Sequence, residues 1–164
     1  MKTYQKLLGV SCLALYLVGC GSGGGESPVE IRVSNNGDFQ INSKVDSVTI
    51  QGVKLNRGNC VVSFVSEEEM VQQAGLAILT DVLPFTPISM QDFKDMASFY
   101  KQFGQKERVA NIENKISQLK QKGVMMEPQT LKFGESLKGI SQGCNIIEAE
   151  IQTDKGAWTF NFNK

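Results

Sequence analysis

Histidine is absent from the 164 residues of this chain. Imidazole is the usual base of serine and cysteine hydrolases and the commonest metal ligand, so its absence excludes those catalytic arrangements and disfavours a metal site. Nothing resembles the twelve-residue calcium loop, and no internal repeat is present. These absences predict a protein that is not an enzyme and that needs neither a metal nor another cofactor.

Neither sign of charge prevails, because 17 Lys and Arg residues stand against 17 Asp and Glu residues. Proteins that bind nucleic acids usually carry a strongly basic surface, since phosphate contacts depend on Lys and Arg. The balanced composition therefore argues against a nucleic-acid partner. No motif indicates a small-molecule ligand.

The N-terminal residues carry the most specific pattern in the chain. Lys2 and Lys6 precede an apolar run over 7–18 that is too short to span a bilayer, and Leu17-Val18-Gly19-Cys20 ends it. This ending resembles the lipobox of bacterial lipoproteins. The resemblance implies transfer of a diacylglyceryl group to the Cys20 thiol, cleavage that removes signal peptide 1–19, and acylation of the new amino terminus. An uncleaved anchor helix is the alternative.

The resemblance also implies a location. Two or three acyl chains hold a protein in a bilayer essentially permanently, since each buried CH₂ contributes about 0.8 kcal/mol. An aspartate directly after the lipidated cysteine would resemble an inner-membrane retention signal, but this chain has Gly21 at that position. We therefore expect the outer membrane, with the domain facing the periplasm or the cell surface. Residues 20–28 would form the lipidated Cys and a flexible Gly/Ser tether, and 29–164 a single domain.

Two cysteines, Cys60 and Cys144, remain in the exported domain, because Cys12 lies in the signal and Cys20 carries the lipid. An even pair in an oxidising compartment predicts one disulfide, and closing so long a loop would stabilise the fold by about 4 kcal/mol. A redox or nucleophilic cysteine is the alternative, but a Cys-x-x-Cys spacing and a histidine partner are both missing.

Strands are predicted where apolar residues alternate with polar ones. A bulge is expected at Gly52, and the last two strands would form a hairpin with Trp158, Phe160 and Phe162 in the core; a ligand platform of stacked rings is the alternative. The predicted strands are 29–33, 48–55, 60–65, 131–133, 137–140, 147–152 and 158–162.

A segment with helical periodicity, at about 67–123, lies between the first three predicted strands and the last four. Ser89 is the expected cap of one helix, with Asp92 three residues on, and Phe93, Met96, Tyr100 and Phe103 would form its apolar stripe. A second helix is expected from Lys106 to a stop at Gly123, while 67–79 remains open between helix and strand. The fold class is therefore α+β: a mainly antiparallel β-sandwich with an inserted helical hairpin at about 67–123 and one disulfide.

Basic residues are the main candidates for binding a partner protein. Arg57, in a turn before Cys60, is one; the others crowd the predicted helices and suit an acidic partner or anionic lipids, with a solvated helix face as the plainer interpretation. Met125 and Met126 would be an adaptable contact or core filler. The helical candidates are Lys101, Lys106, Arg108, Lys115, Lys120 and Lys122.

Together these features predict an envelope lipoprotein that binds another envelope protein as an accessory or assembly subunit of a secretion-type or conjugation-type complex. One alternative is a surface-exposed inhibitor or exclusion factor. A second alternative is an envelope hydrolase that uses carboxylates, for which Glu67, Glu68 and Glu69 or the pair Glu148 and Glu150 are the candidates. Asp92 and Asp95 are interpreted as charges at a helix start.

Replacing Cys20 with Ser removes the thiol that the lipobox resemblance marks for acylation. We expect Cys20→Ser to abolish incorporation of radiolabelled palmitate, because no thioether to the diacylglyceryl group can form. Cys12→Ser is the matched control and should be labelled like the natural protein. Full labelling of Cys20→Ser would contradict the lipobox assignment.

Overall fold

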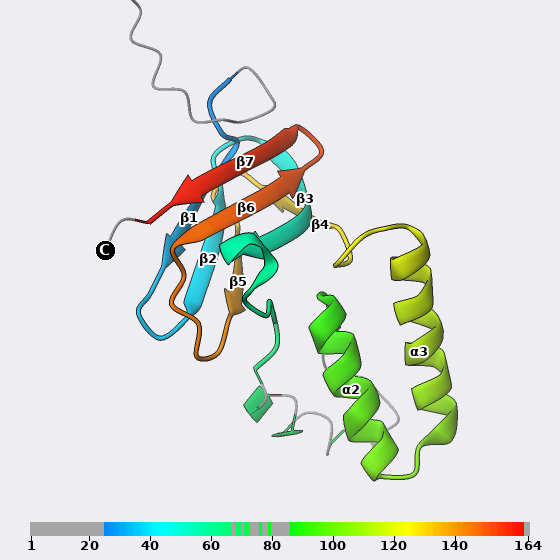
Figure 1. The fold of residues 1–164 in the computed structure, drawn as a ribbon. Coiled ribbons are helices and arrows are strands. Elements are labelled where there is room, and N and C mark those ends of the chain that lie inside the picture. The colour runs from blue at the N-terminus through cyan, green and yellow to red at the C-terminus, as the bar shows by residue number, and fades with distance from the viewer. Residues whose placement is uncertain are drawn as a thin grey trace, which may run out of the picture.

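The computed structural model describes residues 25–66 and 86–162 and, between them, 68, 69, 71, 72, 76 and 79. Two antiparallel sheets and a hairpin of two helices form the fold, and a disulfide joins Cys60 to Cys144 (Figure 1). The predicted α+β sandwich with an inserted helical hairpin is therefore confirmed. The predicted signal peptide 1–19, Cys20 and Glu67 lie outside the described residues.

The first sheet has three strands, and sequence analysis missed its middle one. Its order is β1 (Val29–Val33), β2 (Asp38–Ser43) and β5 (Ser136–Ile140). Gly37, at φ +93°, makes the tight turn between β1 and β2, where a β-carbon would lie 2.1 Å from the Ser141 carbonyl oxygen. The buried side chains of β2 include Phe39 and Ile41, which alternate with more exposed residues as in a half-buried strand. This alternation begins directly after the turn.

The second sheet has four strands: β4 (Gln129–Lys132), β3 (Ser47–Leu55), β6 (Glu148–Thr153) and β7 (Gly156–Asn161), in that order. The register shift between Ile50 and Gly52 matches the expected bulge, and β6 and β7 form the expected terminal hairpin. Trp158, Phe160 and Phe162 are only half-buried, because β7 is an edge strand. Phe160 and Phe162 still pack against the buried core as predicted, whereas Trp158 is not among the side chains packed against it.

The core lies between the two sheets, since buried side chains from both form one cluster. Ile41 of the first sheet and Ile50, Leu55 and Ile151 of the second have no exposed surface. The disulfide packs against this cluster, with 6.0 Å between its Cα atoms. It therefore holds the end of β3 to the loop before β6.

The end of the predicted tether contacts the sandwich. The amide of Lys44 donates to the Pro28 carbonyl at 2.8 Å, and Pro28 is buried. The Lys44 side chain also pairs with Glu26, and this hydrogen bond and charge lower the pKa of the Glu26 carboxyl. Residues 26–28 of the predicted tether are thus held against the sandwich.

The prediction of a strand over 60–65 is wrong. Only isolated bridges occur there, from Cys60 to Leu55 and from Ser63 to Ile140. The amides of Phe64 and Val65 donate to the Asp92 carboxylate instead of to a neighbouring strand. A side chain has therefore taken the donors that a sheet would have used.

The two helices of the hairpin are α2 (Met90–Gln102) and α3 (Lys106–Gln121), close to their predicted bounds. Ser89 and Asp92 form the expected capping box, in which each side chain accepts the other residue's amide. Phe93, Met96 and Tyr100 are buried as expected, but Phe103 is exposed and packs on Phe99 with 4.7 Å between ring centroids. No described helix is long and apolar enough to cross a membrane.

The chain enters and leaves the helical hairpin at one place, which we call the neck. The Met90 amide donates to the Met125 carbonyl and the Glu127 amide to the Ile88 carbonyl, both at 2.8 Å. Ile88 and Met126 pack against the sandwich core, whereas Met90 packs between the helices. The helices therefore stand beside the sandwich and join it through the neck (Figure 1).

Asp92 connects the neck to the rest of the structure. Its side chain is fully buried. It accepts amide hydrogen bonds from Phe64 and Val65 on one side and from Ile88 and Ser89 on the other, at 2.8–3.4 Å. Donors from two segments thus stabilise one buried negative charge.

Replacing Asp92 with Asn puts a donor among these amides and removes the charge that they stabilise. We expect Asp92→Asn to lower the free energy of unfolding by about 2–4 kcal/mol, because buried amides lose their acceptor. Urea unfolding followed through Trp158 fluorescence measures it. Glu107→Gln, a first-turn carboxylate of α3, controls for the helix dipole. Equal losses in the two variants would contradict the role given to Asp92.

Candidate functional site: a groove between sandwich and hairpin

A groove of about 390 Å³ lies where the sandwich meets the helical hairpin. We call it the junction groove. It is lined by the end of β3, the turn and segment that follow, the start of α2 and the neck: residues 53–54, 57–62, 89–91, 94 and 125–126. Two features singled out in the sequence, Arg57 and the Met125-Met126 pair, meet here.

Asn56 fixes the turn that forms one side of the junction groove. Its side-chain oxygen accepts the amides of Ile147 at 2.9 Å and Glu148 at 3.1 Å, and its side-chain nitrogen donates to the Asn145 carbonyl at 2.8 Å. Asn56 and Arg57 both have positive φ, 48° and 60°. Asn tolerates this conformation better than most residues, and the hydrogen bonds compensate for the strain at Arg57.

The charges around the junction groove are mostly positive. Lys54, Arg57 and Lys94 line it, and none of its described lining residues is acidic. Arg57 donates through Nε to Glu148 at 3.2 Å, and Lys54 lies 3.6 Å from Glu150. No ion pair joins Lys94 to a residue that the structure describes. The groove therefore offers positive charge on both its sandwich side and its helix side.

Apolar side chains at the junction groove are open to solvent. Val61 is 57% exposed and Met125 is 58% exposed, although both belong to segments that contact the protein interior. Met90 and Met126, which also line the junction groove, are buried. An exposed valine and methionine beside cations suit a partner with both apolar and acidic groups.

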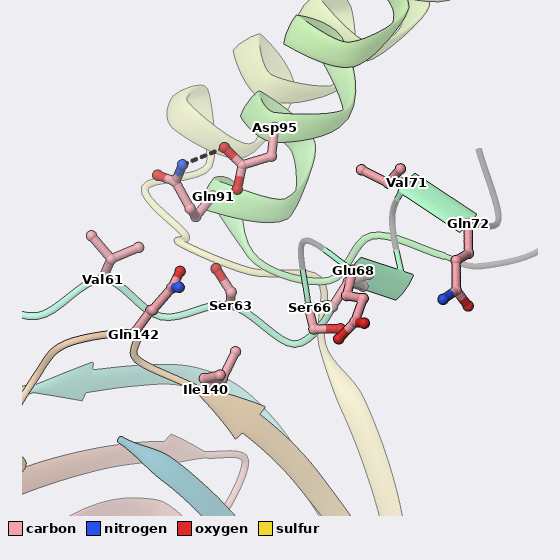
Figure 2. A pocket seen from close by; sticks show the side chains of 11 residues that line it. Val61, Ser63, Ser66, Glu68, Val71, Gln72, Gln91, Asp95, Ile140 and Gln142 are labelled. Carbon is pink, nitrogen blue, oxygen red and sulfur yellow. Dashed lines mark hydrogen bonds between the residues drawn. The ribbon is translucent and has the colours of Figure 1, made fainter. Parts of the chain in front are cut away.

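A second cavity, of about 820 Å³, lies along the same segment and shares Val61 and Gln91 with the junction groove (Figure 2). Gln91 donates to Asp95 at 2.7 Å within α2. The lining also includes Glu68, so both of its described ionisable groups are acidic. The two cavities therefore meet at the first turn of α2 with opposite charge.

The six basic candidates of the helices do not line the junction groove. Lys101 and Lys106 lie at the far end of the hairpin. Arg108 stacks on Tyr100, 5.3 Å from the ring centroid, and Lys115 pairs with Glu127 at 2.5 Å. Helical geometry places Arg108, Lys115 and Lys122 on one stripe of α3 and Lys106 and Lys120 on another, about 160° away.

Three of the acidic candidates, Glu69, Glu148 and Glu150, have structural partners. Glu148 and Glu150 pair with Arg57 and Lys54, and Glu69 accepts hydrogen bonds from the amide and hydroxyl of Ser66. Within the described ranges, no group of three or more Cys, Asp or Glu side chains is arranged to hold a metal ion.

Sequence reasoning missed Lys54 and Lys94 as site residues. Lys54 faces outward between the buried Val53 and Leu55, and Lys94 sits on the exposed side of α2, so each alone is typical of a solvated surface. The site emerges only when β3 and α2, which are distant in sequence, are brought together.

No protein-family model matches this chain, and neither a curated protein nor a solved structure is significantly similar to it.

Removing the Asn56 side chain should open one side of the junction groove. We expect Asn56→Ala to lower the free energy of unfolding by about 2–3 kcal/mol, because three main-chain partners lose their hydrogen bonds and Ala tolerates positive φ poorly. Asn59→Ala is the control, since it removes a single exposed side-chain bond to the Asn56 carbonyl and should cost less than about 1 kcal/mol. Indistinguishable urea midpoints would refute this role for Asn56.

Proposed function

We propose that this protein is an outer-membrane lipoprotein, anchored through Cys20, that acts as a non-enzymatic protein-binding accessory or assembly subunit of an envelope complex. The complex would be of the secretion or conjugation type. The observation that carries the proposal is the junction groove, where three cations and two exposed apolar side chains lie together. The lipobox and the tether support the membrane location.

The architecture of the junction groove suits binding to a protein. Arginine and methionine are enriched at protein interfaces, and exposed apolar surface beside charge is typical of a recognition site. The disulfide and the Asn56 hydrogen bonds hold one side in place before a partner arrives. A rigid site loses less entropy on binding, so even a small contact area can give useful affinity.

A surface-exposed inhibitor or exclusion factor is the second candidate. The end of the helical hairpin favours it, because exposed Phe103 stacks there on Phe99, near Lys101 and Lys106. Such a tip is suited to insertion into the cleft of an incoming enzyme or machine. Protease accessibility on intact cells separates the two, since a periplasmic assembly subunit is shielded by the outer membrane.

Purification from detergent-solubilised membranes tests the main proposal. The tagged full-length protein should recover one envelope protein in near-stoichiometric amount, and the same tag on an unrelated outer-membrane lipoprotein should not. Recovery of the lipoprotein alone, repeated after chemical crosslinking in living cells, would count against an accessory or assembly role.

A further inference from the structure

We propose that the junction groove binds an acidic, extended segment of the partner protein, which adds as a short strand along Val61 and Val62. This inference rests on the proposed function, because it names the chemistry of the partner at the same site. Three observations carry it: unpaired main chain in the groove, the sign of the charges around it, and the exposed apolar side chains.

The main chain of Val61 and Val62 is open to pairing. Neither residue makes a hydrogen bond to any residue that the structure describes. Their neighbours are both held: the Cys60 amide donates to Leu55 at 3.4 Å, and Ser63 exchanges hydrogen bonds with Ile140 at 2.8 and 3.0 Å. A fixed segment with unpaired amides and carbonyls is a template for β-strand addition.

The charges favour an acidic segment. Arg57 reaches Glu148 through Nε, and its two terminal nitrogens make no hydrogen bond within the described chain. Its side chain is 83% exposed, so those nitrogens can meet an incoming carboxylate. Lys94 faces the junction groove from α2 without an ion-pair partner among the described residues. A segment lying between them meets positive charge on both sides.

The exposed side chains favour a peptide over a lipid head group. Successive residues of an extended segment point to opposite sides, so its apolar residues can contact Val61 and Met125 while its acidic residues reach the cations. A head group would use the charges but has no amides with which to pair the main chain of Val61 and Val62. The peptide therefore accounts for all three observations.

Site-specific photocrosslinking in the full-length, membrane-anchored protein tests the proposal. p-Benzoylphenylalanine is placed at Val61 in living cells, and mass spectrometry identifies the attached peptide. We expect one partner segment that carries net negative charge. The same probe at Phe133, which is exposed in the β4–β5 turn, should not capture it.

A charge reversal then tests the electrostatic part. Lys94→Glu should lower capture from position 61 by at least about fivefold, because it puts repulsion where the acidic segment binds. Lys155→Glu reverses an exposed lysine in the β6–β7 turn and should change capture less than about twofold. A synthetic copy of the captured segment should shift the amide NMR signals of Val61 and Val62 in the purified protein.

Several outcomes would overturn the inference. A neutral or basic captured segment, or capture insensitive to Lys94→Glu, would remove the acidic partner. A phospholipid attached at position 61 would assign the groove to head groups. If purification still recovers one envelope protein, and a probe at Phe103 captures that protein while the probe at Val61 does not, this site is refuted and the proposed function stands. No capture at either position, with no partner on purification, would refute both.

Discussion

The buried carboxylate of Asp92 is the interaction on which the arrangement of sandwich and hairpin depends. It completes the cap of α2, accepts the amides of Ile88 and Ser89 at the neck, and takes the amides of Phe64 and Val65 from the segment that leaves the sandwich. A buried anion is stable only where donors converge on it. Satisfying this one charge therefore holds two separate stretches of chain together, residues 64–65 and residues 88–92.

The junction groove follows from two fixed supports. The disulfide and the Asn56 side chain hold the turn after β3 to the loop before β6, while Asp92 holds the start of α2. The short stretch between Cys60 and Ser63 spans the gap between these supports and has nothing to pair with among the described residues. The unpaired main chain is thus a consequence of how its two ends are held.

Local interactions made much of this fold predictable. The capping box needs only Ser89 and Asp92 three residues apart, and the disulfide follows from a count of cysteines and the oxidising compartment expected for them. The strand expected over 60–65 fails for a nonlocal reason, because the apolar pattern there is real but Asp92, far along the chain, takes the amides. The pattern of apolar residues alone cannot show that a distant carboxylate will compete with a neighbouring strand for the main-chain amides.

The candidate site was less predictable than the fold. The sequence marks Arg57 as a candidate for binding a partner, but its pairing with Glu148 of the same chain depends on how β3 aligns with β6. Lys54 and Lys94 can be recognised as site residues only when both are seen to line the same groove, since neither belongs to a local sequence motif. Charge on separate elements becomes a site only through tertiary structure, which composition and periodicity do not specify.

The neck has a consequence for how such a protein can change over evolution. The Glu127 amide is hydrogen-bonded to the Ile88 carbonyl, so the chain leaves the sandwich and returns to it at one point. For the two sheets, the helical hairpin is therefore equivalent to a single loop that is closed at the neck. Helices of another length could be exchanged there without altering the pairing of either sheet. An exchanged hairpin must still supply a carboxylate three residues after its N-cap, because Asp92 accepts the amides of Phe64 and Val65. The hairpin can therefore be exchanged only together with this carboxylate.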